Sequence, residues 1–540
     1  MAAVESPRGR RLGPATAVAA GILLSRLFGF LRVRVVGAAL GLGPHADVLG
    51  AALRAPNVLQ VLLGEGTLSA SIIPVYARLL EEGRRDDARR FAGALFGLLT
   101  AVTAALVLLG MVLAEPLVAV LASGFLRDAA TPGAVDRFAL TVRAVRIIFP
   151  MTGCLVLSVW ALAILNSHRR FFLAYAAPAA WNLAIIAALL SAGRNGPADL
   201  DRILFAACWG ALAGGALQFL VQLPAVLSLL GGLRPSFSRR VWGVKEALAA
   251  FWPLLLGRGV VQLGGYFDLF LASFLATGAV AALGSSQYLY LLPVSLFGMS
   301  VAAAELPELA RRQAGGEQEA FVARVRSGAL QVGFLVTPTV IGYLGLGWLI
   351  VALLFQTGRF GPEETWLVYL VLAAYSLGLP ASTTSRLLQN AFYALADTKL
   401  PARVAAQRVL LAAAVGAPLM LALDRVPLAA WVGGEGDLHL GAVGLAAGSA
   451  VGAWYERLRL GRALAARSPA FGLPGRELVR MATAGLAALA LAAPAWWLLR
   501  GAPLVVTAGV TLPLYAGVYL GLARLLGVSR LGAWLRGAKK

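Results

Sequence analysis

Long apolar windows recur along this sequence and constrain its fold more than any other feature. Each is near or above the roughly 20 residues that a helix needs to cross a bilayer. The chain is 59% hydrophobic and 14% charged, whereas soluble chains carry about a quarter charged residues. Because only helices or closed barrels satisfy their backbone in lipid, we predict an all-α polytopic membrane protein with about 14 transmembrane helices. The windows lie at roughly 15–41, 47–77, 91–122, 137–166, 172–192, 202–231, 244–277, 281–312, 322–355, 365–395, 402–424, 439–464, 477–499 and 503–527.

The net charge of +21 is explained by membrane topology. Basic residues collect in alternate connections and in both tails, so the positive-inside rule predicts that both termini are cytoplasmic and disfavours a nucleic-acid role. Arg8, Arg10 and Arg11 imitate a secretion signal, but the apolar run continues to Gly41, so we expect an uncleaved first span. The basic connections include Arg84, Arg85, Arg89 and Arg90; Arg169 and Arg170; Arg239 and Arg240; Arg311 and Arg312; Lys399 and Arg403; and Arg457, Arg459 and Arg462.

Motifs for catalysis or metal binding are missing from the sequence. It contains no Walker-type loop, no HExxH and no convincing nucleophile–base pair, and no connection is long enough to fold as an extramembrane domain. His45, His168 and His439 are scattered, and Cys154 and Cys208 fall inside apolar runs, where we expect free thiols. These observations favour a transporter over an enzyme or a receptor.

An internal repeat predicts two pseudo-symmetric six-helix lobes. Three matched positions have similar offsets and the same parity of spans, which is typical of parallel repeats that alternate access to a site at their interface. We therefore predict an N-lobe at 1–235, a C-lobe at 236–468 and two appended helices at 469–540. The matches are Pro74 with Pro307 (307 − 74 = 233), Arg26 with Arg258 (258 − 26 = 232) and Asn166 with Asn390 (390 − 166 = 224).

Charged residues interrupt the first two apolar windows. A charge at bilayer depth costs roughly 2.5–3.5 kcal/mol on insertion scales, so these side chains snorkel to the interface, pair with each other or line a wet cavity. For Arg26 and Arg32 we favour an anion site, because guanidinium groups suit phosphate. Arg32 would need a bend near Gly29 to join Arg26, since the two lie about 240° apart on an ideal helix, whereas Arg34 lies about 80° from Arg26. The remaining charges in this stretch are Asp47, Arg54 and Glu65.

The second half of the chain offers weaker candidates. Arg258 and Gln262 share a helical face at i and i+4. Asp268 either pairs with Arg258 or binds a coupled Na⁺ or H⁺, with Asn390 as a further oxygen ligand; no other cofactor is expected. Near the end of window 281–312, Glu305 and Glu308 with Arg311 and Arg312 predict a solvated salt-bridge cluster and not a gate. Small residues at 213–216 predict close helix packing.

Several segments together resemble the MurJ/MviN family, the lipid II flippases of the MOP exporter superfamily. The resemblance extends over nearly the whole chain and is densest in the first five windows. It implies a fourteen-helix, two-lobed transporter whose appended pair forms a groove for a polyprenyl tail. The segments are SRLFGFLR (Ser25–Arg32), LRAPNVLQ after Asp47, EGTLSASIIPVYA (Glu65–Ala77), ILN with AAPAAWN (Ala176–Asn182) and FYALADTKLP (Phe392–Pro401).

The resemblance also implies roles for individual residues. The family's first-span arginines fall on Arg26 and Arg32, its acidic residue on Asp47 and its EG pair on Glu65. The chain departs from the family where two arginines are expected, at Gln60 and Tyr288, and Leu291 stands where a glutamate is often found. We hypothesise that Arg54 and Arg258 compensate for the lost positive charge.

The expected function is translocation of a lipid-linked peptidoglycan precursor from the cytoplasmic to the outer leaflet of the bacterial inner membrane. Arginines would bind the diphosphate of an undecaprenyl-type substrate, the membrane potential would favour outward movement of its charge, and cell-wall synthesis machinery is an expected partner. Alternatives are another polyprenyl-diphosphate-linked oligosaccharide as cargo, a cation-coupled multidrug exporter of the same superfamily, and, from another class, a membrane-embedded glycosyltransferase or a non-transporting scaffold.

Overall fold

The computed structural model describes residues 14–63, 65–130, 132–194, 199–433, 436–468, 471–472 and 474–528, and the chain divides into two compact units. Unit 1 comprises the described residues up to Leu40 together with Pro44–Phe270, and unit 2 comprises Gly41–Gly43 together with residues from Leu271 onward. This division lies later than the predicted boundary at 235/236. The reason is that α10 (Val244–Ala272) begins inside the core of unit 1, where Val244 and Ala247 are buried in one cluster with Phe91.

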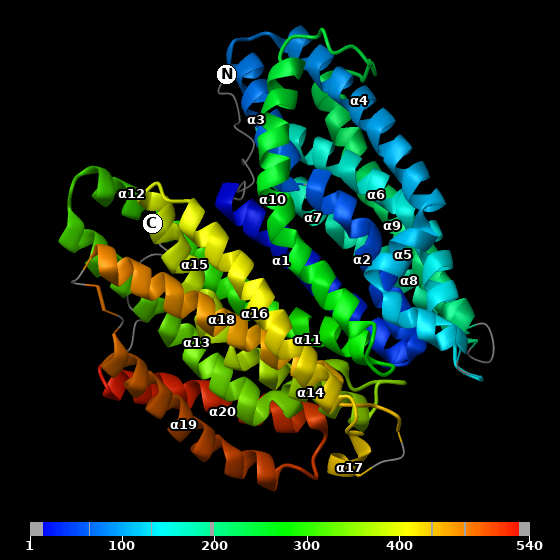
Figure 1. Ribbon diagram of the computed structural model, residues 1–540. Helices are drawn as coiled ribbons and strands as arrows, with labels where there is room; N and C mark the ends of the chain where they lie inside the picture. Colours follow the sequence, from blue (N-terminus) through cyan, green and yellow to red (C-terminus); the bar gives the residue numbers. More distant parts are fainter. Residues whose placement is uncertain are drawn as a thin grey trace, which may run out of the picture. The chain divides into compact units, whose positions relative to one another are not determined.

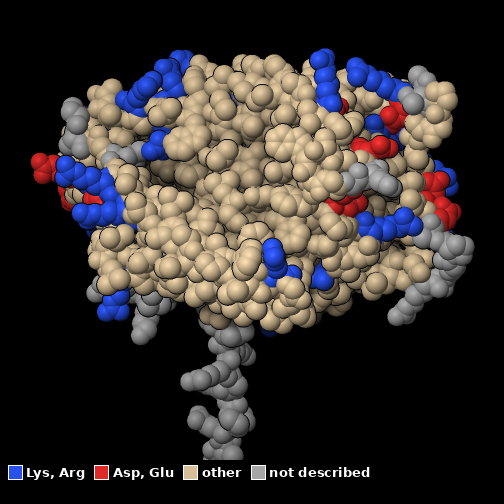
Figure 2. Space-filling view, turned by 90° about the horizontal axis from the view of Figure 1, so that it is seen from below, with Lys and Arg blue, Asp and Glu red and all other residues tan. Residues whose placement is uncertain are grey.

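Every one of the predicted apolar windows contains helix in the residues that the structure describes. Within those residues, 10 helical stretches are long and apolar enough to cross a membrane, or up to 11 if the bent pair α14–α15 is one span. Figure 2 shows broad stretches of surface that carry no charged side chain, as expected where helices face lipid. The prediction of an all-α polytopic membrane protein is confirmed.

Unit 1 is built around α6, which contacts α2, α3, α4 and α9. Most of its apolar stretch is buried, as expected for a helix that is hydrophobic on all sides. The indole Nε1 of its buried Trp160 donates to the carbonyl oxygen of Ala92 at 3.1 Å. The helices of unit 1 before α10 are α1 (Pro14–Leu40), α2 (Pro44–Leu63), α3 (Glu65–Glu81), α4 (Arg85–Val112), α5 (Ala114–Leu121), the 3₁₀ helix η1 (Ser123–Ala130), α6 (Arg137–Ser167), α7 (Phe171–Ala176), α8 (Pro178–Arg194) and α9 (Leu200–Leu230).

Small residues bring α8 and α9 into close contact. A Cβ added at Gly214 of α9 would lie 2.7 Å from the backbone oxygen of Trp181 in α8, and one at Gly210 would lie 2.7 Å from the Cβ of Ala188. Larger side chains at either position would push the two helices apart. The predicted close packing at 213–216 is therefore confirmed at Gly214, and it matches the way small residues let helices approach in membranes.

Unit 2 is built around α13, which contacts α12, α14, α15, α19 and α20. The last two helices lie side by side against it (Figure 1). Helix α20 is joined to α13 by Tyr515 and Tyr519, whose hydroxyl groups each donate to an α13 carbonyl at 2.7 Å. The helices of unit 2 are α11 (Ala279–Pro293), the π-helical segment η2 (Val294–Met299), α12 (Ser300–Ala314), α13 (Gln318–Phe355), α14 (Pro362–Leu377), α15 (Leu379–Ala394), α16 (Lys399–Leu423), α17 (Ala429–Val432), α18 (Gly441–Arg467), α19 (Gly475–Leu498) and α20 (Leu504–Leu525).

One predicted span of unit 2 is broken. The helices α14 and α15 meet at a 41° bend, next to Gly378, where an added Cβ would lie 2.7 Å from the Cα of Ala450 in α18. The indole Nε1 of Trp454, also in α18, donates to the carbonyl oxygen of Leu377 at 2.8 Å. The missing side chain of Gly378 lets α18 approach the bend closely, and α18 supplies a donor for a carbonyl at the helix end, where such groups lack an intrahelical partner.

Candidate substrate-binding site

The two arginines favoured as an anion site lie on one uninterrupted helix. Helix α1 stays α-helical from Pro14 to Leu40 and passes through Gly29 without a break. The expected unwinding at Gly29 is absent, because no proline or irregular turn interrupts the helix there. On a continuous helix the six-residue spacing leaves Arg26 and Arg32 about 240° apart. Arg26 is exposed and Arg32 is half-buried, so the two guanidinium groups have different surroundings.

Arg32 lies against an aromatic side chain of the neighbouring helix α8. Its guanidinium carbon is 4.7 Å from the centre of the Trp181 ring, within the distance of a cation–π contact. The Trp181 Nε1 is directed at the Sδ of Met151 at 3.1 Å and at the carbonyl oxygen of Ala211 at 3.2 Å. The arginine is therefore supported by a ring that α6 and α9 hold in place.

Asp47 lies in a buried cluster of charges at the start of α2. It is fully buried and accepts a hydrogen bond from Nη1 of Arg137 at 3.2 Å. The same guanidinium donates through Nε and Nη2 to both carboxylate oxygens of Asp128, at 2.6 and 2.9 Å, and lies 4.5 Å from the Phe125 ring centre. Sequence analysis missed Arg137 and Asp128 as partners. Asp47 thus joins α2 to η1 and α6.

The other predicted ligands of the anion are only partly placed. Arg54, in α2, is half-buried. The side chains of Glu65, Arg258 and Gln60 lie outside the described residues. Within the described part of unit 1, Arg32 lies on the Trp181 ring and Asp47 accepts from Arg137.

The two residues suggested for a coupled cation belong to different units. Asp268 is a half-buried residue of α10 in unit 1. Asn390, in α15 of unit 2, uses its Nδ2 to donate to the carbonyl oxygen of Ala302 in α12 at 2.6 Å. This bond ties two helices of unit 2 together. Among the residues searched, no three His, Cys, Asp or Glu side chains are grouped as a metal site would require.

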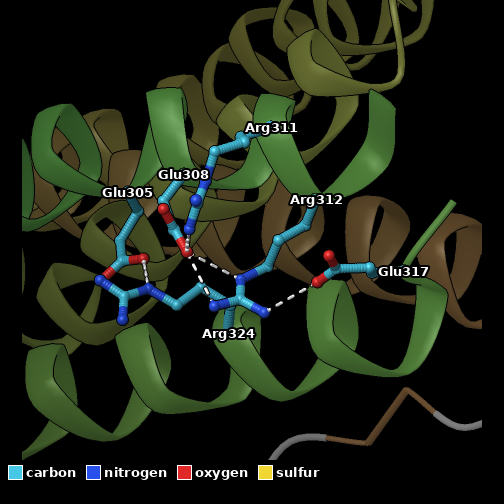
Figure 3. Close-up of polar contacts among 6 residues, drawn as sticks. All are labelled: Glu305, Glu308, Arg311, Arg312, Glu317 and Arg324. Carbon is cyan, nitrogen blue, oxygen red and sulfur yellow. Dashed lines mark hydrogen bonds and ion pairs between the residues drawn. The ribbon is translucent and has the colours of Figure 1, made fainter. Parts of the chain in front are cut away.

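The predicted salt-bridge cluster at the end of α12 is confirmed (Figure 3). Glu308 pairs with Arg311 at 2.9 Å and with Arg312 at 2.8 Å, and Arg312 also reaches Glu317 at 3.2 Å. Figure 3 also shows Glu305, which pairs with Arg324 of α13. Glu305 itself is buried, so the solvated part of the cluster is the Glu308 side.

The aspartate of the FYALADTKLP segment caps the helix that follows it. Asp397 accepts backbone N–H bonds from Lys399 and Leu400, both at 3.1 Å, at the start of α16, and Nη2 of Arg467 donates to it at 2.5 Å. The Leu400 backbone bond and then the Arg467 bond hold the pKa of this carboxyl below its ordinary value. This part of the motif therefore has a structural role in unit 2.

Sequence analysis missed an ion pair in unit 2 between a buried glutamate and a partly exposed arginine. Glu456 of α18 is 1% exposed, and its two oxygens accept hydrogen bonds from Gln389 of α15 and Arg408 of α16, each at 2.7 Å. Both charges fall inside predicted spans, at 439–464 and 402–424. A charge within an apolar window is itself a signal of a pair or a site, and that signal was available from the sequence.

The family model and the relatives that match this chain carry the same description. The family model described as "Lipid II flippase MurJ" matches residues 36–514. The chain is 36% identical over 389 residues to the "Probable lipid II flippase MurJ" of Rhizobium meliloti, covering 71% of this chain and 70% of that protein. It is 30% identical over 387 residues to the "Lipid II flippase MurJ" of Burkholderia cenocepacia, covering 71% and 73%.

Solved structures share the fold. One described as "Lipid II flippase MurJ, inward closed conformation" aligns with a TM-score of 0.70 at 19% identity, covering 94% of this chain and 99% of that one. An inward-facing multidrug resistance MATE family transporter of the MOP superfamily aligns with a TM-score of 0.59 at 13% identity, covering 83% and 96%.

Proposed function

Because the chain belongs to the lipid II flippase MurJ family, we propose that it moves lipid II from the cytoplasmic to the outer leaflet by alternating access. The observation that carries this proposal is the family match over residues 36–514, which includes helices of both units. The substrate is amphipathic, with a polyprenyl tail and an anionic diphosphate headgroup. A membrane protein that moves it must bind the headgroup inside the bilayer and leave the tail in lipid.

Arg26 and Arg32 are the proposed ligands of the diphosphate. The forked donors of a guanidinium group match phosphate oxygens. Asp47 acts differently in this proposal, since it is held by Arg137: it fixes the start of α2 and does not contact the substrate. Arg54 and Arg258 supply further positive charge, and the appended helices α19 and α20 border the groove for the polyprenyl tail.

The proposed setting is the bacterial inner membrane, with both termini in the cytoplasm as the positive-inside pattern predicts. Outward movement of each diphosphate charge is then favoured by about 2.3 kcal/mol per 100 mV of inside-negative potential. Na⁺ or H⁺ coupling at Asp268 is a further part of the proposal, and the cell-wall synthesis machinery is the proposed partner.

A second cargo is favoured by one observation. Tyr288 and Leu291, which stand where the family resemblance leads us to expect an arginine and a glutamate, both lie on α11, and Leu291 is exposed. The loss of two charges there favours a polyprenyl diphosphate that carries a different glycan. Comparing lipid II with an undecaprenyl-diphosphate oligosaccharide in the same vesicles would decide between the two cargoes.

The test is rescue of a bacterium depleted of its essential lipid II flippase. We expect the wild-type chain to restore growth and lipid II translocation, and Arg26→Ala and Arg32→Ala to abolish both. Arg34→Ala is the matched control, because it removes the same charge from the same helix at a position that the proposal does not use. No growth with a well-expressed wild-type chain, or equal growth with all three variants, would refute the proposal.

A further inference from the structure

The contact between Arg32 and Trp181 defines where the guanidinium lies. An arginine on a helix surface ordinarily has many rotamers, and ordering such a side chain costs up to about 2 kcal/mol of conformational entropy. Here the guanidinium carbon lies 4.7 Å from the indole ring centre. Stacking on a ring engages the flat face of a guanidinium, whereas bidentate bonds to phosphate use its N–H edge. The two contacts are therefore compatible in geometry.

Trp181 is itself held by two neighbouring helices of unit 1, α6 and α9. Its Nε1 is directed at two acceptors, the Sδ of Met151 in α6 at 3.1 Å and the carbonyl oxygen of Ala211 in α9 at 3.2 Å. Its backbone oxygen would lie 2.7 Å from a Cβ at Gly214, so α9 approaches α8 closely at this residue. A ring held at both its backbone and its edge is a rigid support.

We propose that Trp181 is the positioning residue for Arg32, holding its guanidinium so that the N–H edge meets the diphosphate of the substrate. The inference rests on the proposed function for the identity of that substrate. It replaces the bend at Gly29: since α1 is continuous, the direction of Arg32 is set by the neighbouring helix α8 and not by unwinding of its own helix. Arg26, on another side of α1, then approaches the same headgroup independently.

The test is a double-mutant cycle in nanodiscs, with undecaprenyl diphosphate as the binding probe. A cation–π contact contributes about 1–2 kcal/mol when it is shielded from water, so we expect Trp181→Leu to weaken binding about 5- to 30-fold. In the Arg32→Ala background the same change should have almost no effect, because there is no guanidinium left to position. Equal losses in the two backgrounds, or wild-type affinity of Trp181→Leu, would overturn the proposal.

Two further variants separate positioning from packing. Trp181→Phe keeps an aromatic face but loses the Nε1 anchor, so it should recover part of the affinity that Trp181→Leu loses. Trp209→Leu is the matched control on α9, because it removes a tryptophan that is 58% exposed. This variant should bind the probe with wild-type affinity. Thermal unfolding confirms that each variant folds. If Trp181→Phe were as weak as Trp181→Leu, packing and not the ring face would be responsible.

Failure of this proposal and failure of the proposed function give different results. Translocation of lipid II is measured on the same proteins. A wild-type chain that binds undecaprenyl diphosphate and shows the coupling, but moves no lipid II, would refute the function and keep the positioning role. If the wild-type chain moved lipid II normally but the effects of Trp181→Leu and Arg32→Ala on probe binding were additive, the positioning role would be refuted and the function kept. If Arg32→Ala bound the probe like wild type, Arg32 would not be a ligand and the positioning proposal would fail.

Discussion

Removing Arg137 should destabilise unit 1 far more than removing the aspartate that it binds. The guanidinium makes three hydrogen bonds, one to Asp47 at 3.2 Å and two to Asp128 at 2.6 and 2.9 Å. Arg137→Met keeps an unbranched side chain but removes the guanidinium, which leaves two carboxylates without their cation, and Asp47 is fully buried. Breaking a buried ion pair by removing one partner costs about 3–5 kcal/mol, so we expect a loss of that size.

The cost of Asp47→Asn should be smaller. The variant removes one charge but keeps a side chain that can accept from Arg137, and both bonds from Arg137 to Asp128 remain. The loss is then that of one hydrogen bond between two charged groups weakened to a bond between the guanidinium and a neutral amide, about 1–2 kcal/mol. If Arg137→Met is less stable than Asp47→Asn, the cluster depends mainly on the arginine; the opposite order would mean that it depends mainly on Asp47.

Equilibrium unfolding in mixed detergent micelles would measure these differences. Arg143→Met is the matched control: Arg143 lies on the same helix, is exposed and is 4.2 Å from the Phe205 ring centre, a contact that contributes about 0.5–1 kcal/mol at an exposed site. If Arg137→Met were no less stable than Arg143→Met, the buried cluster would contribute nothing to folding. If Asp47→Asn were fully stable but moved no lipid II, Asp47 would act in transport.

Three further predictions follow from other contacts. Arg408→Met leaves Glu456 buried without its cation and should cost about 3–5 kcal/mol, most of which Arg408→Met with Glu456→Met should restore in the same unfolding assay. Gly448→Leu should lower the thermal midpoint because a Cβ there would lie 2.4 Å from the backbone of α16, whereas Gly509→Leu, with nothing within 4 Å, should not. Burial and two nearby arginines lower the pKa of His168 below 6.5, so the unfolded state binds the proton more readily than the folded state. The free energy of unfolding should therefore rise with pH from the folded-state pKa up to about 6.5. His168→Gln should abolish that dependence in thermal unfolding between pH 5 and 8.

The helical architecture was predictable because hydropathy alone decides it. Each predicted window contains helix, since a backbone in lipid has few other ways to satisfy its hydrogen bonds. The breaks within these windows were harder to predict from the sequence. The bend at Gly378 depends on space beside Ala450 and on the donor of Trp454, both more than seventy residues away. The later division between the units has the same origin, because it depends on where the start of α10 packs.

The sequence was enough to predict which charged residues of the candidate site need a partner or a ligand, but not to predict which residues they contact. Insertion cost singles out Arg32 and Asp47 from the sequence, but it assigns no contacts. Asp47 is satisfied by Arg137, 90 residues away, and Arg32 lies on Trp181, a residue that carries no charge and gives no hydropathy signal. Because an ideal helix places Arg26 and Arg32 on different sides, sequence reasoning required a break in α1. In the proposal above, the helix stays regular and the neighbouring Trp181 ring sets the direction of the Arg32 side chain. The residues that position a charged ligand in a bilayer are therefore to be sought among the uncharged side chains packed beside it.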